Sequence, residues 1–225
     1  MFITYEQLKK INPKGVESLM RGFVDTFNKY ATNYGITTPN RIQDFISQVS
    51  HECDGFKTSK EYASGAAYEG RKDLGNKYAG DGVKFKGRGF IQTTGRANYA
   101  DTSKGLYNDP NILISNPKKL ENPVDATLSA MYYWKRKGLN EISDKPADWT
   151  ITVTTKKGKK IKMNKFQYIT YKINGGFNGL KEREGYLAKA KQILTNVVDV
   201  AKNNSGNLII TIGLFAGIAY LWHRS

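Results

Sequence analysis

The sequence is poor in the residues that build disulfides and metal sites, since it has one cysteine and two histidines among 225 residues. A single cysteine, Cys53, excludes an internal disulfide, so the fold has to be held together by packing. A zinc hydrolase needs three protein ligands, commonly histidine, and one of the two histidines, His223, lies at the extreme C-terminus. We therefore expect neither a metal nor a cofactor.

Two other catalytic classes are disfavoured by missing residues. Gly87-Arg88-Gly89 lacks the Lys-Ser or Lys-Thr ending of a phosphate-binding loop and the third glycine of a dinucleotide site. Cys53 follows His51 by two positions, and residues two apart on a helix point about 200° away from each other, so they cannot form a nucleophile and base pair. We interpret Cys53 as a small residue that fills space.

Acidic residues are few: 20 Asp and Glu stand against 35 Lys and Arg, which gives a formal net charge of +15. Such a charge attracts polyanions, among them nucleic acid, anionic lipid and bacterial wall polymers. Aromatic residues do not interleave with the lysine runs, as a single-strand nucleic-acid binder requires. We therefore expect no specific nucleic-acid partner, and many of these lysines are ordinary solvated surface.

The apolar residues, 39% of the chain, are enough for a sizeable core, and their spacing predicts a mainly α-helical domain over residues 1–202. The helical signals are a capping box at Thr4 and Gln7, the apolar set Leu19, Met20, Phe23, Phe27 and Tyr30, and the segments Ala126 to Trp134, Phe166 to Ile173 and Leu180 to Val200. Thr150 to Lys165 alternates instead, which predicts a small basic β-hairpin with arms at 151–155 and 160–163.

Two carboxylates nine residues apart, Glu52 and Glu61, form the most informative pattern. A helix is predicted to begin after Thr38 and to bury one face, made of Ile42, Phe45, Ile46 and Val49. Glu52 continues that face near the helix's end, where burial and the helix dipole favour a protonated acid, whereas Glu61 lies beyond the stop at Gly55 and is expected to be wetter. Such a pair is typical of glycosidic bond hydrolysis, although an ion-pair partner and a solvated carboxylate fit the spacing too.

Short motifs then recur in a fixed order over about residues 40 to 195. They are His51-Glu52, Lys60-Glu61-Tyr62, Tyr68-Glu69-Gly70-Arg71, Gly80-Asp81-Gly82, Gly87-Arg88-Gly89-Phe90-Ile91-Gln92 with Thr94 and Asn98, Tyr133-Trp134, Gly138-Leu139-Asn140, and Ile173-Asn174-Gly175-Gly176 with Arg183. The chain resembles glycoside hydrolase family 19, and within it looks most like the phage endolysin branch. The resemblance implies a lysozyme-like helical domain.

The resemblance also implies roles for single residues. It makes Glu52 the general acid and Glu61 the general base, and Thr94 stands where plant members carry a serine that helps hold the attacking water. It implies substrate-binding or neighbouring positions at Gln92, Asn98, Asn174, Arg183 and His51. The family inverts configuration, which predicts a separation of about 6.5 to 9.5 Å between the two carboxyl groups.

Two carboxylates compete with Glu61 for the role of base, because Glu69 and Asp81 are also near in sequence. We expect Glu69 to form an ion pair with Arg71 or Arg88. The chain also departs from the family pattern: Cys53-Asp54 replaces a pair of small residues, and the basic insertion at 150–165 is unusual. Neither departure removes a catalytic group.

Chitin is neutral, so the excess of Lys and Arg favours peptidoglycan glycan strands as the substrate. We expect a peptidoglycan hydrolase, with a chitinase of the same family and a non-catalytic basic virion protein that binds cell wall or DNA as alternatives.

Residues 203–206 are predicted to form a linker, and residues 207–223 a transmembrane or membrane-anchoring helix. About 23 Å of uncharged helix is short for a span, and a buried or oligomerising helix is the alternative. Because the N-terminus lacks a secretory signal, we expect a virion-associated enzyme in a phage or bacterial membrane, acting on the cell wall.

Overall fold

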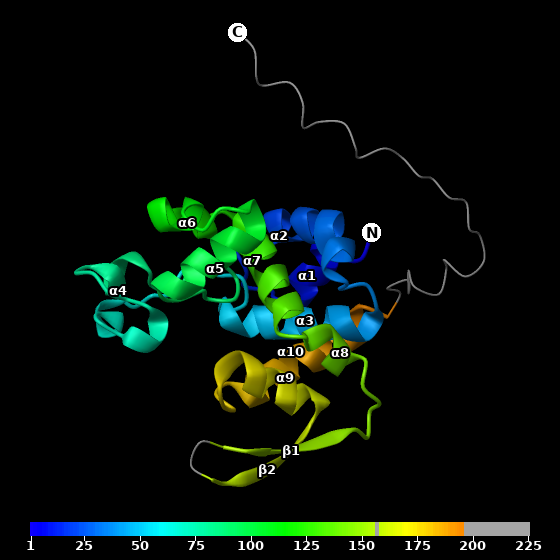
Figure 1. Ribbon diagram of the computed structural model, residues 1–225. Helices are drawn as coiled ribbons and strands as arrows, with labels where there is room; N and C mark the ends of the chain where they lie inside the picture. Colours follow the sequence, from blue (N-terminus) through cyan, green and yellow to red (C-terminus); the bar gives the residue numbers. More distant parts are fainter. Residues whose placement is uncertain (156–157, 196–225) are drawn as a thin grey trace, which may run out of the picture.

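The structure, a computed structural model, describes residues 1–155 and 158–195. Within them the chain is mainly α-helical with one two-stranded sheet, as the sequence predicts (Figure 1). The α-helices are α1 (Tyr5–Ile11), α2 (Glu17–Tyr30), α3 (Pro39–Glu52), α4 (Asp81–Lys84), α5 (Arg96–Tyr107), α6 (Ile112–Ser115), α7 (Pro123–Arg136), α8 (Leu139–Ser143), α9 (Lys165–Asn174) and α10 (Leu180–Ile193). Short 3-10 helices are η1 (Ala31–Tyr34), η2 (Ala66–Tyr68), η3 (Lys72–Leu74) and η4 (Pro117–Glu121).

Helix α3 lies in the middle of the array, with α8 and α10 packed against it (Figure 1). It begins as predicted: Thr38 Oγ1 accepts a hydrogen bond from the Arg41 amide, and Pro39 is the first helical residue. The predicted apolar face is fully buried, but every residue from 42 to 50 is buried as well. The prediction of a single buried face is therefore incomplete, because α10 covers the side that the apolar pattern leaves to water.

The core beside α3 is built largely from aromatic rings that are 0% exposed: Phe23, Phe27, Phe45, Phe56, Phe90 and Trp134. Phe45 of α3 meets Trp134 of α7 edge-on, with ring centroids 5.3 Å apart. Phe56 and Phe90 come from loops, and their centroids lie 5.1 Å apart. Burying a large aromatic side chain stabilises a fold by roughly 3–5 kcal/mol, measured as the cost of its truncation. These two rings therefore anchor the loops that follow α3 and precede α5.

Most of the predicted helices are confirmed, and one boundary is wrong. The Thr4 and Gln7 capping box opens α1, the segment 126–134 lies inside α7, and the segment 166–173 lies inside α9. Helix α10, however, ends at Ile193 and not at Val200. Leu194 leaves the helical conformation with a ψ of 43° and turns its side chain into the core, where it is 1% exposed.

The basic hairpin is confirmed as β1 (Thr150–Thr154) and β2 (Lys160–Asn164), which pair antiparallel with Thr150 opposite Asn164. Asn164 then caps α9 in a capping box with Gln167. The hairpin lies against α9 (Figure 1) and leads directly into it. It therefore sets the start of the helix whose last residue is Asn174.

The predicted linker 203–206 and hydrophobic helix 207–223 lie outside the described residues. None of the helices in the described part of the chain is both long and apolar enough to cross a membrane.

Candidate active site

Glu52 is the last residue of α3, and a buried arginine from α10 lies against it. Arg183 Nη2 donates to Glu52 Oε1 at 2.5 Å, and Nη1 donates to Gln48 Oε1 at 2.6 Å. Gln48 Nε2 in turn donates to Thr170 Oγ1 of α9 at 2.9 Å. The Arg183 side chain is 2% exposed and that of Glu52 is 17% exposed. A line of hydrogen bonds through three helices therefore fixes the Glu52 carboxyl group.

The chain turns sharply after Glu52, because three consecutive residues have positive φ angles: Asp54 at 50°, Gly55 at 64° and Phe56 at 63°. Glycine adopts this conformation freely, whereas the other two are strained in it. Phe56 is held there by the burial of its ring in the core. The helix thus ends at Glu52, three residues before the predicted stop at Gly55, and the turn that contains Gly55 sends the chain towards Glu61.

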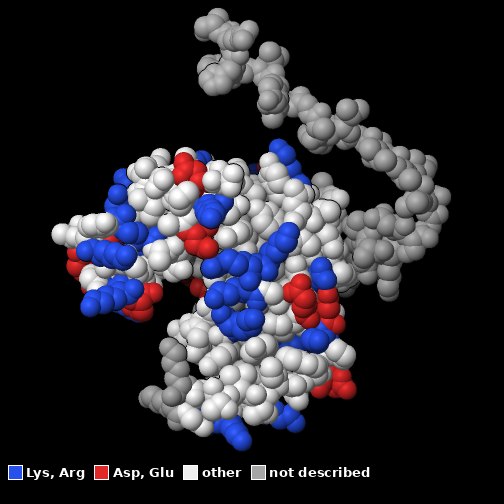
Figure 2. Space-filling model, viewed as in Figure 1, with Lys and Arg blue, Asp and Glu red and all other residues white. Residues whose placement is uncertain are grey.

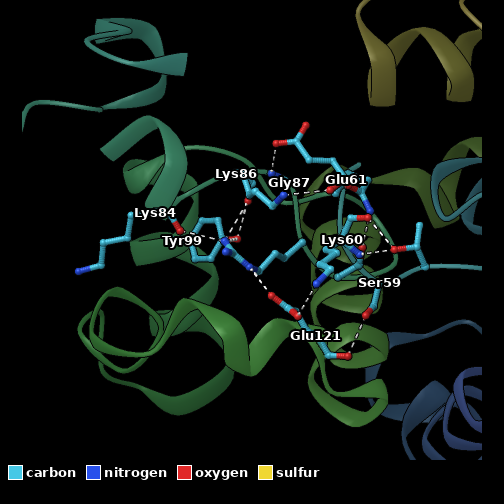
Figure 3. Close-up of polar contacts among 12 residues, drawn as sticks. Ser59, Lys60, Glu61, Lys84, Lys86, Gly87, Tyr99 and Glu121 are labelled. Atoms are coloured by element: carbon cyan, nitrogen blue, oxygen red, sulfur yellow. Dashed lines mark hydrogen bonds and ion pairs between the residues drawn. The ribbon is translucent and has the colours of Figure 1, made fainter. Parts of the chain in front are cut away.

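Glu61 lies on an irregular segment and is held at both carboxylate oxygens, one of them by Gly87 (Figure 3). Gly87 N donates to Oε1 at 2.9 Å, and the Tyr68 hydroxyl donates to Oε2 at 2.9 Å. The Glu61 amide donates to the Gly87 carbonyl at 2.9 Å, and Lys86 Nζ donates to the Glu61 carbonyl at 3.1 Å. Backbone and carboxylate are therefore fixed together against one short loop.

The same loop is held by a buried guanidinium (Figure 3). Arg88 Nε donates to Glu121 Oε1 at 2.8 Å, and Nη1 donates to the Lys84 carbonyl at 2.8 Å and to the Tyr99 hydroxyl at 3.0 Å. Ser59 Oγ donates to the Glu121 carbonyl at 2.8 Å. Glu121 of η4 thus connects Arg88 to Ser59, which lies two residues before Glu61, and the Tyr99 hydroxyl connects Arg88 to α5. This network fixes the position of the segment that carries Glu61.

Gly87 is the point at which three predicted site residues meet. A Cβ on Gly87 would lie 2.7 Å from Gln92 Oε1, 3.3 Å from Thr94 Oγ1 and 3.5 Å from the Cβ of Glu61. A heavy atom at 2.7 Å cannot be accommodated without moving Gln92. A side chain at position 87 would therefore displace the Gln92 amide and crowd Thr94, so the glycine lets Glu61, Gln92 and Thr94 lie close together.

Gln92 and Thr94 also line a pocket of about 280 Å³ together with Glu52, Asn98 and Asn174. Figure 2 shows the surface hollowed between the region of α4 and the region of α9. Gln92 and Thr94, which lie close to Glu61 at Gly87, therefore also line the pocket that contains Glu52. The distance between the two carboxyl groups stays a prediction.

The amides in this pocket keep acceptors available. The side-chain nitrogens of Asn98 and Asn174 donate to backbone carbonyls at 2.7 and 3.4 Å. Gln92 has a φ of 53°, and its buried Oε1 has no hydrogen-bond partner among the described residues. Strained backbone and unpaired buried acceptors collect at functional sites, where a ligand completes the hydrogen bonds. The amide set is suited to the hydroxyl and acetamido groups of a sugar.

Comparison with known proteins agrees with this geometry. Residues 18–203 match the family model described as chitinase class I. A Haemophilus influenzae protein described as a glycosyl hydrolase family 19 domain-containing protein is 30% identical over 215 residues, which is 81% of this chain and 92% of that protein. The chain belongs to glycoside hydrolase family 19. It is accordingly a glycoside hydrolase, as its sequence predicts.

More distant relatives share the fold. An endochitinase of Pisum sativum is 26% identical over 190 residues, and these span 75% of this chain but 58% of the pea protein. Chitinase C of Streptomyces griseus superposes with a TM-score of 0.60 at 19% identity, covering 86% of this chain and 77% of that one. A class IV chitinase of Zea mays reaches a TM-score of 0.56 at 16% identity, covering 87% of this chain and 92% of that one. Together they confirm the lysozyme-like helical fold of the family 19 chain.

The two competing carboxylates of this family 19 chain have structural partners. Asp81 is 1% exposed and bound to Arg96 at 2.6 Å, and this contact lowers the pKa of Asp81 to about 2. The expected ion pair of Glu69 with Arg71 or Arg88 is wrong: its oxygens accept hydrogen bonds from the Gly80 and Gly82 amides. Arg71 and Arg88 pair instead with Asp73 and Glu121. Backbone amides at the N-terminus of α4 take the place of the arginine expected from sequence.

His51 and Cys53 flank the acid without joining the pocket lining. His51 Nδ1 lies 2.8 Å from Glu182 Oε2, and a Cβ on Gly179 would lie 2.1 Å from Cε1 of the imidazole ring. The loop after Asn174 thus packs directly onto His51, one residue before the acid. Cys53 is fully buried in the core, and burial raises the pKa of its thiol.

Three residues of the site were missed by sequence reasoning. Tyr68 belongs to the Tyr68-Glu69-Gly70-Arg71 motif, but its hydrogen bond to Glu61 depends on how the loop between them folds, and sequence spacing does not indicate this. Arg136 and Lys137 line the pocket from the end of α7. The sequence does carry a signal for these two, since they lie between the Tyr133-Trp134 and Gly138-Leu139-Asn140 motifs of the resemblance.

Proposed function

We propose that this enzyme cleaves β-1,4 bonds between amino sugars of peptidoglycan by a single displacement that inverts configuration. The arrangement of two carboxyl groups around one loop carries the proposal: Glu52 lines the pocket from α3, and Glu61 is bonded to the loop at Gly87, beside Gln92 and Thr94. Inverting glycosidases use one carboxylic acid for the leaving oxygen and one carboxylate for water.

In this mechanism Glu52 gives its proton to the glycosidic oxygen as the bond from that oxygen to the anomeric carbon breaks. Glu61 removes a proton from a water molecule, whose oxygen forms the new bond to the anomeric carbon from the opposite face. The bonds from Tyr68 and Gly87 hold Glu61 in one orientation. The Thr94 hydroxyl, next to Gly87, helps to place the water.

The remaining residues hold the glycan or the acid. Gln92, Asn98 and Asn174, which all line the pocket, present amide groups to the sugar. Arg183 is buried behind Glu52, so we assign it to positioning the acid and not to contact with the sugar. His51 connects the acid's helix to the loop after Asn174.

The charge of the chain supports peptidoglycan as the substrate. The formal net charge of +15 attracts a polyanionic wall, whereas chitin is neutral. Chitin is the second candidate substrate, because the pea relative is described as an endochitinase and the structural neighbours as chitinases.

Digestion of two substrates by the full-length enzyme separates these candidates. We expect purified sacculi to release soluble fragments with new amino-sugar reducing ends, identified by mass, because both carboxyl groups and the charge favour that substrate. Product formed first as the α-anomer, observed by NMR, would establish inversion. If the enzyme cleaves chitin oligomers but leaves sacculi undigested, the peptidoglycan proposal is rejected. Glu52→Gln enzyme provides the blank for contaminating activity.

We also propose that the enzyme is phage virion-associated and held to a membrane by residues 207–223. The support is sequence alone: the run from Leu208 to Trp222 carries no charged residue. We expect the full chain, but not a chain ending at residue 202, to float with phospholipid vesicles in a density gradient. Equal flotation of the two chains would reject the proposed membrane anchor, and absence of the protein from purified virions would reject the proposed phage association.

A further inference from the structure

The basic end of helix α7 enters the pocket that contains Glu52. Lys135, Arg136 and Lys137 follow one another at the end of this helix, and the last two line the pocket. Figure 2 shows Lys and Arg side chains gathered over α7. A helix C-terminus favours cations, which explains basic residues at this point of the chain but not their entry into a glycan cleft.

The charges around the pocket are unequally matched. Glu52 is paired with Arg183 at 2.5 Å, and Arg136 Nη1 lies 2.9 Å from Asp101 Oδ2. Lys137, by contrast, makes no ion pair with any residue in the described ranges 1–155 and 158–195. The pocket therefore offers one ammonium group whose charge the protein does not balance.

Lys137 is half-buried and is held over an aromatic ring. Its Nζ lies 5.5 Å from the centroid of Tyr133, which lines the same pocket. The Tyr133 hydroxyl donates to the Ile173 carbonyl at 3.3 Å, which ties the ring to α9. A cation–π contact orients an ammonium without cancelling its charge. In a cleft with less water than an open surface, such a charge attracts an anion more strongly.

We propose that Lys137, assisted by Arg136, forms a subsite for a carboxylate group carried by the glycan. The inference rests on the proposed action on peptidoglycan. There, the stem peptide attached to the lactyl group of muramic acid carries carboxylates, and muramic acid without a peptide carries a free lactyl carboxylate. Chitin has no anionic group, so Lys137 adds nothing to chitin binding. Lys137 is thus a specificity residue and takes no part in bond cleavage.

Two soluble polymers with the same backbone isolate the carboxylate: glycol chitin, which is neutral, and carboxymethyl chitin, which is anionic. We expect Lys137→Met to raise KM for carboxymethyl chitin about tenfold, as the loss of one charged hydrogen bond predicts. Values of kcat on both polymers, and KM for glycol chitin, should stay unchanged. Lys137→Arg, which keeps the charge, should retain the wild-type preference.

Lys135→Met is the matched control. It removes the same charge two positions earlier, but Lys135 Nζ donates to the Asn33 carbonyl at 3.0 Å and does not line the pocket. We expect it to leave both KM values as in wild type. An equal rise in KM on the anionic polymer for Lys135→Met and Lys137→Met, or an equal rise on both polymers for Lys137→Met, would overturn the subsite.

Sacculi then identify the source of the carboxylate. If Lys137→Met weakens action on amidase-treated strands, in which the lactyl carboxylates are free, the lactyl carboxylate is recognised. If it weakens action on intact sacculi only, the peptide carboxylates are recognised. Wild-type enzyme that cleaves both chitin polymers but not sacculi would reject the peptidoglycan function, while the polymer comparison would still decide the subsite.

Discussion

Glu52→Gln is expected to lower kcat on every glycan that the enzyme cleaves by about 10²- to 10⁴-fold, the usual contribution of a general acid. Glutamine has the same shape and keeps an oxygen for the 2.5 Å bond from Arg183, so the pocket should persist. It has no proton to deliver to the leaving oxygen. Release of reducing ends at saturating substrate measures the effect, and urea unfolding confirms that the variant is folded.

The leaving group distinguishes loss of acid catalysis from general damage. A dinitrophenyl glycoside departs without protonation, so the deficit of Glu52→Gln should shrink to within about tenfold on it, since proton delivery no longer limits the step. Glu61→Gln should keep its full deficit on this substrate, because the water still needs a base. A deficit of Glu52→Gln that is equal on polymeric and dinitrophenyl substrates would argue against its role as the acid.

Glu182→Gln is a control from the same neighbourhood. Glu182 contacts His51, the residue before Glu52, and its side chain is 54% exposed. The variant changes one charge near the acid but leaves the Glu52 carboxyl group and Arg183 intact. We expect kcat within about threefold of wild type, since exposed charge pairs contribute little.

Features of the fold that depend on neighbouring residues were predictable. The start of α3 at Thr38 and Pro39, the capping box of α1 and the turn at Gly55 each depend on backbone and side-chain contacts within a few residues. The hairpin of β1 and β2 depends on alternation over five residues in each arm. Such local contacts form in the same way whatever the rest of the fold is.

Features set by distant segments were not predictable from pattern. Gln48 is a polar residue that does not belong to the predicted apolar face of α3, yet it is buried and bonded to Thr170 and Arg183, which lie 122 and 135 residues further along. Glu69 lacks the arginine partner that charge alone suggests, because it accepts hydrogen bonds from two backbone amides at the N-terminus of α4. Periodicity reports which side of a helix is apolar, and it does not report what another helix will cover.

The candidate site follows the same division. Glu52 was placed by periodicity at the end of a buried face, and its position there is confirmed. The positions of Gln92, Thr94, Asn98 and Asn174 came from the resemblance, since an amide on a loop has no periodic signal. The net charge of the chain does not single out Lys137, because it does not indicate which lysine or arginine lines a cleft.

Arg183→Met is expected to destabilise the fold by about 3–5 kcal/mol and to abolish most activity. The change removes a buried guanidinium and leaves Gln48 Oε1 and Glu52 Oε1 without the donor that each has in the wild type. It also releases the Glu52 carboxyl group from its fixed position. Methionine fills much of the space of the arginine stem, so the loss reports the charge and its hydrogen bonds. Urea unfolding at pH 7 gives the free energy, and reducing-end release gives kcat.

The double variant Glu52→Gln with Arg183→Met separates the ion pair from packing. If the pair is coupled, the double variant should be more stable than the sum of the two single losses by about 0.5–3 kcal/mol, the range for contacting residues. This follows because removing both charges leaves neither one buried alone. Arg41→Met with Asp144→Asn is the comparison pair: it too joins α3 to a distant segment, but its side chains are 23% and 40% exposed, so its coupling should fall below about 1 kcal/mol. Strict additivity at Glu52 and Arg183 would mean that α10 supports the acid through packing alone, and Arg183 would lose its assignment as the residue that positions the acid.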